Sequence, residues 1–310
     1  MAFYTGTANS WSDLVTVLQT QCVANGWSID GNVIYKSGTT ANFLVTPEAN
    51  YLLIYGGTGK SGGALTGQSP RGSRTGGSYV TFPVNYDLHI FTSPDEVYLV
   101  INYNVDKYIQ LSFGRCNLPW MNNAPWFTGS FSTLTGTMTD DFTINANSYI
   151  CQVGRVNLSS FNNLGLFAHP WHDSQAAYSY CASNIYSDVG VTAEWKTQWY
   201  NKADFIAVGS TQAVASLLNC SPSSFNSGTI LLPIKAYQNM GSKGYGQIVE
   251  LENSRLCRID NQAPGEVVTY GSEDWKVYPW YRKNSSVRSP VNSITDHSGT
   301  FGWAVRYTGP

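Results

Sequence analysis

The chain has 310 residues, of which only 12 % are charged and 14 % are aromatic, and its formal net charge is −2. A high aromatic content with little net charge excludes an intrinsically disordered protein, and 18 basic against 20 acidic residues leave no basic excess for binding a nucleic acid duplex. No apolar run approaches the roughly 18 residues of a membrane-spanning helix, and the start of the chain lacks the basic and apolar segments of a secretion signal, so we expect no membrane span and a chain made and folded in a cytosol.

The first predicted element is a helix that begins after Ser10. The Ser10 hydroxyl can accept a hydrogen bond at the helix start, and Asp13 stands three residues further on, as in a capping box. Apolar side chains then fall on one helical face, namely Trp11, Leu14, Val15, Leu18 and Cys22. Asn25-Gly26 ends the helix. Residues 27–29 and 33–35 then form a hairpin around a Gly-containing loop.

A glycine-rich segment follows a predicted strand at 51–55. Residues 56–78 contain nine glycines together with Lys60, Arg71 and Arg74, and they contain no acidic residue. Long loops of this composition are either functional or ordered by a partner. The sequence therefore predicts a long, flexible, basic loop in which Lys60, Arg71 and Arg74 bind a partner.

Two further strands are predicted at 97–103 and 108–113. The second alternates apolar and more polar residues, Ile109, Leu111 and Phe113 against Tyr108, Gln110 and Ser112. Residues 117–130 then carry two Pro-Trp pairs, which break regular structure. We expect a domain boundary here, with a helix and an antiparallel β domain over 1–118 and a β-rich domain over 119–310.

The remainder of the chain is predicted to be mixed and then mainly strand. Three segments could form short helices, at 175–182, 194–199 and 211–218. Strands are expected at 230–236, 246–252, 267–270, 275–281 and 301–307, with a turn over 271–274. In the closing strand we expect large apolar groups on one face and Gly302, Ala304 and Arg306 on the other. The predicted fold class is mainly β (α+β), with antiparallel, sandwich-like sheets, a short N-terminal helix and long loops.

Two glycine motifs mimic signatures of nucleotide binding and hydrolysis. Residues 55–61 end in the Gly-Lys-Ser of a phosphate-binding loop, but Ile54 stands where that loop requires its first glycine. Residues 59–63 fit Gly-x-Ser-x-Gly, but neither the strand before nor the helix after the hydrolase motif is predicted. We expect neither activity and no cofactor.

The clearest candidate metal ligands are His169, His172 and Asp173. Pro170 disfavours a helical pair of imidazoles, and a segment rich in Trp and His is more typical of a packed corner. We therefore expect no metal there. The six cysteines are far apart, with no Cys-x-x-Cys pair, so we expect buried free thiols.

Tryptophans in predicted loops are candidate contacts to a glycan or receptor, because aromatic rings can stack on sugars. These are Trp120, Trp126 and Trp171. Most other tryptophans alternate in predicted strands and indicate core positions. The carboxylate pairs Asp140-Asp141 and Glu273-Asp274 fall in predicted turns, where solvated caps are the usual role.

Three stretches carry a likeness to known proteins. The first contains Gly6-Thr7-Ala8, the helix, Gly26-Trp27 and the hairpin; the second runs from Val97 to Pro119. The third begins at Leu231-Leu232-Pro233-Ile234 and continues through Pro264 to Val268, Trp275 to Pro279 and the closing strand. Together they resemble a family of virion structural proteins encoded among the tail and baseplate genes of tailed bacteriophages.

The resemblance implies a tail-tip or baseplate component with no catalytic residues. It further implies contacts with other virion tail or baseplate proteins, a homo-oligomer of three-fold or six-fold symmetry, and a place in the virion tail after assembly in the host cytoplasm. Two alternatives stay open. One is a receptor-binding or carbohydrate-binding tail module that contacts a host surface glycan, and the other is a hydrolase of envelope polysaccharide or peptidoglycan.

Overall fold

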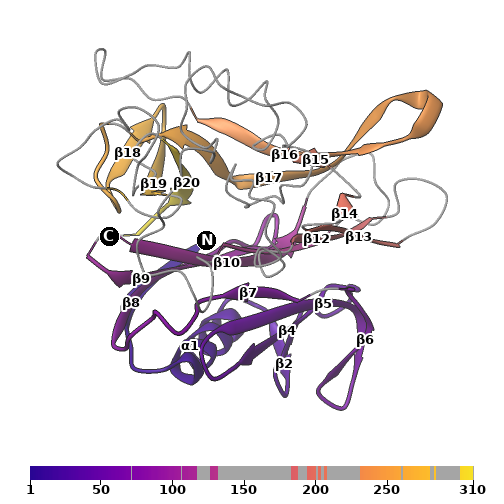
Figure 1. The fold of residues 1–310 in the computed structure, drawn as a ribbon, viewed down its shortest axis with the longest axis horizontal. Coiled ribbons are helices and arrows are strands. Elements are labelled where there is room, and N and C mark those ends of the chain that lie inside the picture. The colour runs from indigo at the N-terminus through magenta and orange to yellow at the C-terminus, as the bar shows by residue number, and fades with distance from the viewer. Residues whose placement is uncertain are drawn as a thin grey trace.

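The computed structural model stacks three antiparallel sheets in layers, with an N-terminal helix packed between two of them (Figure 1). It describes residues 1–70, 72–105, 107–116, 126–131, 183–187, 194–199, 202–203, 206–207, 231–259, 261–279, 283 and 301–309. Figure 1 shows an eight-stranded sheet (sheet A, β1 and β8 to β14) in the middle, with a second sheet (sheet C, β15 to β20) on one side and the third (sheet B, β2 to β7) with helix α1 (Trp11–Ala24) on the other. The predicted fold class, mainly β with antiparallel sheets and a short N-terminal helix, is confirmed.

Sheet A is eight-stranded and has the order β1-β8-β9-β10-β11-β12-β13-β14. Its strands are β1 (Ala2–Ala8), β8 (Val84–Ile90), β9 (Glu96–Asn104), β10 (Lys107–Arg115), β11 (Trp126–Phe131), β12 (Ser183–Ser187), β13 (Glu194–Trp199) and β14 (Lys202–Ala203). The chain start pairs with β8, so the N-terminus lies at the edge of the central layer.

Sheet B packs with helix α1 (Trp11–Ala24) against one face of sheet A. Its path is β2-β3-β4-β5-β6, with β7 paired to β5. These strands are β2 (Ser28–Asp30), β3 (Val33–Tyr35), β4 (Asn42–Pro47), β5 (Leu52–Ser61), β6 (Ala64–Gln68) and β7 (Ser73–Thr75). The predicted helix and the hairpin that follows it are both confirmed.

Sheet C covers the other face of sheet A. Its order is β15-β16-β17-β20-β19-β18. The strands are β15 (Ile206–Ala207), β16 (Leu232–Asn239), β17 (Tyr245–Arg258), β18 (Val267–Tyr270), β19 (Glu273–Pro279) and β20 (Phe301–Tyr307), and a short 3-10 helix, η4 (Gly241–Lys243), joins β16 to β17.

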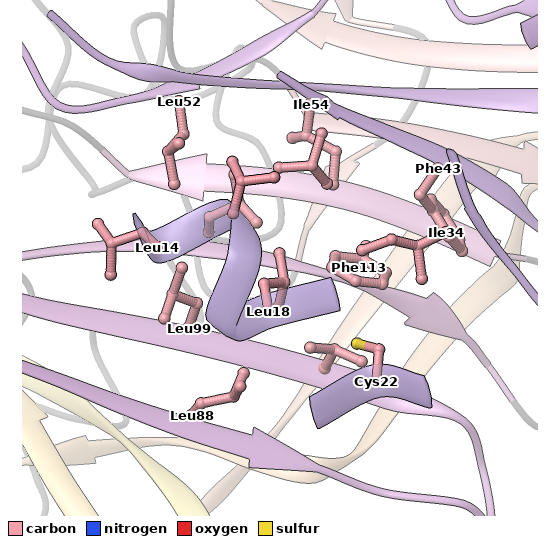
Figure 2. Packing of buried hydrophobic residues seen from close by; sticks show 14 of the residues in the cluster. Leu14, Leu18, Cys22, Ile34, Phe43, Leu52, Ile54, Leu88, Leu99 and Phe113 are labelled. Carbon is pink, nitrogen blue, oxygen red and sulfur yellow. The ribbon is translucent and has the colours of Figure 1, made fainter. Parts of the chain in front are cut away.

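Helix α1 forms as expected from its sequence. The Ser10 Oγ accepts a hydrogen bond from the Asp13 backbone N–H at 3.0 Å, which satisfies one unpaired donor at the helix start. Its apolar face is buried between sheets A and B, as Figure 2 shows for Leu14, Leu18 and Cys22 among side chains from both sheets. This apolar layer is the largest described core of the molecule.

Sheet A has two different faces because side chains alternate along each strand. On β8 to β10 the residues Leu88, Leu99, Ile109, Leu111 and Phe113 face the core with α1 and sheet B. The opposite face carries Asn85, Asp87, His89, Asn102, Tyr98 and Tyr108 and meets sheet C. The alternation predicted for 108–113 is therefore real, but its more polar face is also covered by a sheet.

The prediction of a flexible loop over 56–78 was wrong. This segment forms most of β5 and all of β6 and β7, so it belongs to sheet B. Its glycines serve close packing: a Cβ at Gly56 would collide with the indole of Trp195, and one at Gly76 with the indole of Trp11. Trp195 also donates a hydrogen bond from Nε1 to the carbonyl of Gly67 at 2.8 Å. Aromatic rings lying against bare backbone thus account for some of these glycines, while Gly62, Gly63 and Gly67 have positive φ values, a conformation that favours glycine.

Several smaller expectations are also corrected. Residues 194–199 form strand β13 and not a helix, while 175–182 and 211–218 lie outside the described residues. Strand β19 begins at Glu273, inside the expected turn. The alternation expected for the closing strand is confirmed, because Trp303 and Val305 of β20 pack toward sheet A while Ala304 joins a small cluster with Trp275 on the other face.

The expected domain boundary after residue 118 does not coincide with a division between sheets. Strand β11 pairs with β10 across it and continues sheet A. The prediction of buried free thiols is confirmed for Cys22, Cys116 and Cys257, and the other three cysteines lie outside the described residues.

Candidate functional site

A polar cleft opens where sheet C stops covering the polar face of sheet A. Its volume is about 180 Å³. The lining residues come from β8, β9, β10, β19 and the turn before β18: Asn85, Tyr86, Asp87, Val100, Asn102, Tyr108, Gly265, Lys276 and Tyr278.

Strand register places three of these side chains in one row. Asn102 of β9 lies directly opposite Asn85 of β8 on one side and Tyr108 of β10 on the other. Asp87 follows Asn85 by two residues and so points to the same face. The floor of the cleft is therefore set by three paired strands and not by loops, which makes it a rigid surface.

A chain of hydrogen bonds joins the two sheets along one wall of the cleft. The hydroxyl of Tyr278 on β19 donates to Asp87 Oδ2 at 2.8 Å, and His89 Nε2 lies 2.8 Å from the same hydroxyl. Lys276 Nζ forms an ion pair with Asp87 Oδ2, also at 2.8 Å. Since Tyr278 donates its proton to Asp87, its oxygen is left to accept from His89 Nε2.

Burial determines the protonation states of His89 and Tyr278 in this chain of hydrogen bonds. Burial lowers the pKa of His89 to about 3, with Asp87 opposing the shift and Lys276 adding to it, so the imidazole is neutral at physiological pH. Burial and the neighbouring Asp87 charge raise the pKa of Tyr278 well above its usual value. The wall of the cleft therefore contains a neutral His, a neutral Tyr and one ion pair.

Aromatic rings enclose the ammonium group of Lys276. Its Nζ lies 4.6 Å from the ring centroid of Phe3 and 5.6 Å from that of Tyr307. The two rings meet edge to face at 4.9 Å, and Phe3 also contacts His89 at 4.9 Å. These contacts hold Lys276 against Asp87. The ammonium charge of Lys276 therefore interacts with one carboxylate and with two aromatic rings.

The side chains on the open side of the cleft keep hydrogen-bonding capacity. Asn85 Oδ1 accepts from Thr7 at 3.1 Å, and Asn102 Nδ2 donates to the carbonyls of Asn104 and Lys107. Within the described part of the chain, Asn85 Nδ2, Asn102 Oδ1 and Asp87 Oδ1 have no protein partner. The cleft thus offers one amide donor and two acceptors to a ligand.

A second buried polar cluster lies deeper in the same interface, around Glu96. This carboxylate is fully buried and accepts hydrogen bonds from the Tyr98 hydroxyl, the backbone N–H groups of Glu252 and Asn253, and the Asn253 side chain, at 2.9–3.0 Å. Burial raises the pKa of Glu96 to about 7 against these hydrogen bonds, which lower it. Because both oxygens of the Glu96 carboxylate accept hydrogen bonds from the protein, Glu96 links sheet A to sheet C and is not available to a ligand.

The predicted partner-binding residues are engaged inside the chain where the structure describes them. Lys60 lies in β5, forms an ion pair with Asp30 at 2.8 Å and stands 4.3 Å from the ring centroid of Tyr35. Its hydrogen bond with Asp30 raises the pKa of Lys60. Arg74 lies in β7 over the ring of Tyr51 at 4.4 Å, and Arg71 is outside the described residues. Their binding to a partner stays a prediction.

Of the candidate glycan-contacting tryptophans, the structure describes only Trp126. It lies in β11, is 2 % exposed and packs against Phe43, Tyr186 and Trp195, so the expectation of an open loop position was wrong. The other proposed contacts and ligands lie outside the described residues: Trp120, Trp171, His169, His172 and Asp173.

Sequence reasoning missed the cleft, although one signal was present. Residues 84–90 alternate between apolar residues and Asn85, Asp87 and His89, which is the pattern of a strand with one polar face. Strand β19 of sheet C, which forms the wall of the cleft, contacts Asp87 through Tyr278, 191 residues further along the chain, and nothing local in the sequence indicates that contact.

No protein-family model matches the sequence, and neither does any characterised protein. Among the described residues, no group of three or more His, Cys, Asp or Glu side chains is placed to hold a metal ion. In the same part of the chain, no helix has the length and apolar character needed to cross a membrane.

Proposed function

We propose that this chain is a structural component of a tailed-phage virion, where it assembles into the tail tip or baseplate through contacts with other copies and with other tail proteins. The observation that carries the proposal is the distribution of the stretches that resemble the virion family. They supply β1, α1, β2 and β3, then β9 and β10, then parts of β16, β18, β19 and β20. The likeness therefore extends over the framework of all three sheets and not over one local motif.

An exposed sheet edge supports a role in assembly. Strand β18 ends the order of sheet C, and its Val267 and Tyr270 are 41 % and 61 % exposed. A strand edge with large apolar side chains is a template for pairing or packing with another chain. Together with the low content of charged residues, it suits the aromatic, weakly charged surfaces of protein interfaces.

The described carboxylates give less support to a glycan hydrolase. Asp87 is paired with Lys276, Glu96 is saturated by protein donors, and Glu273 pairs with Arg306 at 2.8 Å. Asp274 accepts a hydrogen bond from Thr269 across the β18–β19 hairpin. A glycosidase requires two carboxyl groups facing one bond across a cleft, whereas the described cleft is lined by one.

Removal of the gene from the phage genome tests the proposal. We expect particles without tails, or with tails that lack a tip or baseplate in negative-stain electron micrographs, and rescue by the wild-type gene supplied from a plasmid. Rescue by a variant with Asn50→Ala, an exposed turn residue, is the matched control. Particles of normal form and full infectivity without the gene would contradict the proposal.

A further inference from the structure

The cleft at the open end of the interface between sheets A and C has the chemistry of a sugar site. Three properties carry this inference: its size, its balance of donors and acceptors, and its lack of net charge. Each is independent of the proposed place of the chain in a virion.

Its size limits the ligand. A volume of about 180 Å³ is below the usual range of drug-sized pockets and corresponds to one compact group of about the bulk of a single pyranose ring. Because the cleft lies at the end of the sheet interface and is partly open, such a unit can remain linked to a longer chain outside.

The polar atoms suit hydroxyl groups. A hydroxyl donates one hydrogen bond and accepts others, so it pairs with both kinds of atom that the cleft presents. Asn85 Nδ2 can donate, while Asn102 Oδ1 and Asp87 Oδ1 can accept. The register Asn85–Asn102–Tyr108 sets these groups beside an aromatic ring, which can cover the apolar C–H face of a sugar.

The acceptors are held in place before any ligand arrives. Asp87 is fixed by Tyr278 and Lys276, and the amide of Asn102 is oriented by two backbone carbonyls. Preorganised polar groups spend little conformational entropy on binding. Such a site can recognise a small ligand despite few contacts.

The charge balance selects a neutral ligand. Asp87 and Lys276 neutralise each other at 2.8 Å, and His89 is uncharged in the wall behind them. An anion would meet the Asp87 carboxylate, and a metal ion would find one carboxylate already paired with an ammonium group. We propose that the cleft binds one neutral pyranose unit, at the end of or within a glycan.

Saturation-transfer NMR on the purified full-length chain tests this proposal. The probes are the methyl glycosides of glucose, galactose, mannose and N-acetylglucosamine, with glucuronic acid and glucose 6-phosphate as charged counterparts. We expect saturable binding of at least one neutral glycoside, with no loss on raising the salt concentration, since screening affects only charged partners.

Three variants connect that signal to the cleft. Asn85→Ala removes the donor and should weaken binding at least about fivefold, the loss of roughly one hydrogen bond, and Asn85→Trp should abolish it by filling the space. Asn85 is exposed, so both variants should fold, which thermal melting checks. Asn50→Ala removes an exposed amide from the turn between β4 and β5, away from the cleft, and should leave binding unchanged.

Four results would overturn the proposal. They are no binding across the neutral panel, tighter binding of the charged sugars than of their neutral counterparts, unchanged binding in the two folded Asn85 variants, and equal loss of binding in Asn50→Ala. None of them bears on whether the chain is part of a particle, so this test and the gene-deletion test can fail separately.

Discussion

At the scale of single residues, the hydroxyl of Tyr278 is the point where sheets A and C are joined beside the cleft. It is buried, donates to Asp87 and lies within hydrogen-bond distance of His89 Nε2. A buried polar atom that loses its partner destabilises a fold by about 1–3 kcal/mol. The hydroxyl should therefore matter for stability as well as for the position of Asp87.

Tyr278→Phe should lower the free energy of unfolding by about 1–3 kcal/mol, because Asp87 Oδ2 and His89 Nε2 both lose their hydrogen bond with this hydroxyl in the interface. Urea denaturation measures this. Tyr270→Phe removes the same hydroxyl from a residue that is 61 % exposed and should change stability by less than about 0.5 kcal/mol. Equal effects of the two substitutions would show that the hydrogen bonds of Tyr278 contribute nothing.

His89 should make the fold sensitive to acid. Its pKa falls from 6.5 to about 3 on folding, so the unfolded chain binds a proton below pH 6.5 that the folded chain does not bind. The stability that His89 contributes is therefore present above pH 6.5 and is lost as pH falls toward 3, by up to about 1.4 kcal/mol per pH unit.

The comparison with His89→Gln isolates this effect. The difference in unfolding free energy between wild type and variant should shrink as pH is lowered from 7 to 4. Glutamine does not titrate, and all other titratable groups are the same in the two proteins. Urea titrations at a series of pH values give the two curves. Parallel curves over that range would mean that His89 takes up its proton equally in the folded and unfolded states.

At the scale of elements, strand β17 departs from regular pairing where it meets Glu96. The register with β16 jumps from Arg255 opposite Pro233 to Leu251 opposite Ile234, so residues 252–254 bulge out of that ladder. The freed N–H groups of Glu252 and Asn253 donate to Glu96 of β9, and Arg255 donates to the carbonyls of Leu251, Glu252 and Ser254. Glu96 thus pairs with the free backbone N–H groups of the bulge, and Arg255 pairs with its carbonyl groups.

Glu96→Ala should lower the free energy of unfolding by at least about 3 kcal/mol, because it leaves several buried donors without an acceptor. Chemical denaturation measures the loss. Glu48→Ala, at an exposed turn position, is the matched control and should be close to neutral. A small effect of Glu96→Ala would mean that water replaces the carboxylate and that the bulge does not depend on it.

Elements with local signals were predictable, and elements defined by distant contacts were not. The helix after Ser10 and the hairpin that follows it depend on caps, turns and short-range periodicity, all of which are visible in the sequence. The 56–78 segment was missed because its glycines indicate flexibility when read alone. The need for glycine at positions 56 and 76 comes from Trp195 and Trp11, which reach them from other parts of the chain.

The cleft was unpredictable for the same reason. Its floor could be inferred from the alternation in 84–90 once that segment is treated as a strand. Its wall could not, because Lys276 and Tyr278 come from sheet C, whose strands pair with one another and pack against sheet A. The sequence shows the polar residues of the cleft but does not indicate that they contact one another.

At the scale of the whole molecule, sheet A separates two unlike interfaces. Toward α1 and sheet B the core consists mainly of apolar side chains from the helix and from both sheets. Toward sheet C it mixes aromatic packing with His89, Glu96 and the ion pair of Asp87 with Lys276. Apolar packing supplies most of the stability, while the polar contacts fix how sheet C sits on sheet A.

This architecture leaves assembly surfaces at its edges. The first and last strands of each sheet bound the layers, and β18 combines an edge position with exposed apolar side chains. Contacts among identical copies through such edges generate closed rings when the symmetry closes. A three-fold or six-fold ring in a phage tail is the assembly that we propose for this chain.

Quantitative mass spectrometry of phage particles purified through two successive density gradients tests the central claim most directly. We predict that peptides of this chain co-purify with the particles at a constant ratio to the major tail protein, at a copy number that is a multiple of three. Peptides found only in the soluble fraction of the lysate, and absent from infectious particles, would contradict the account.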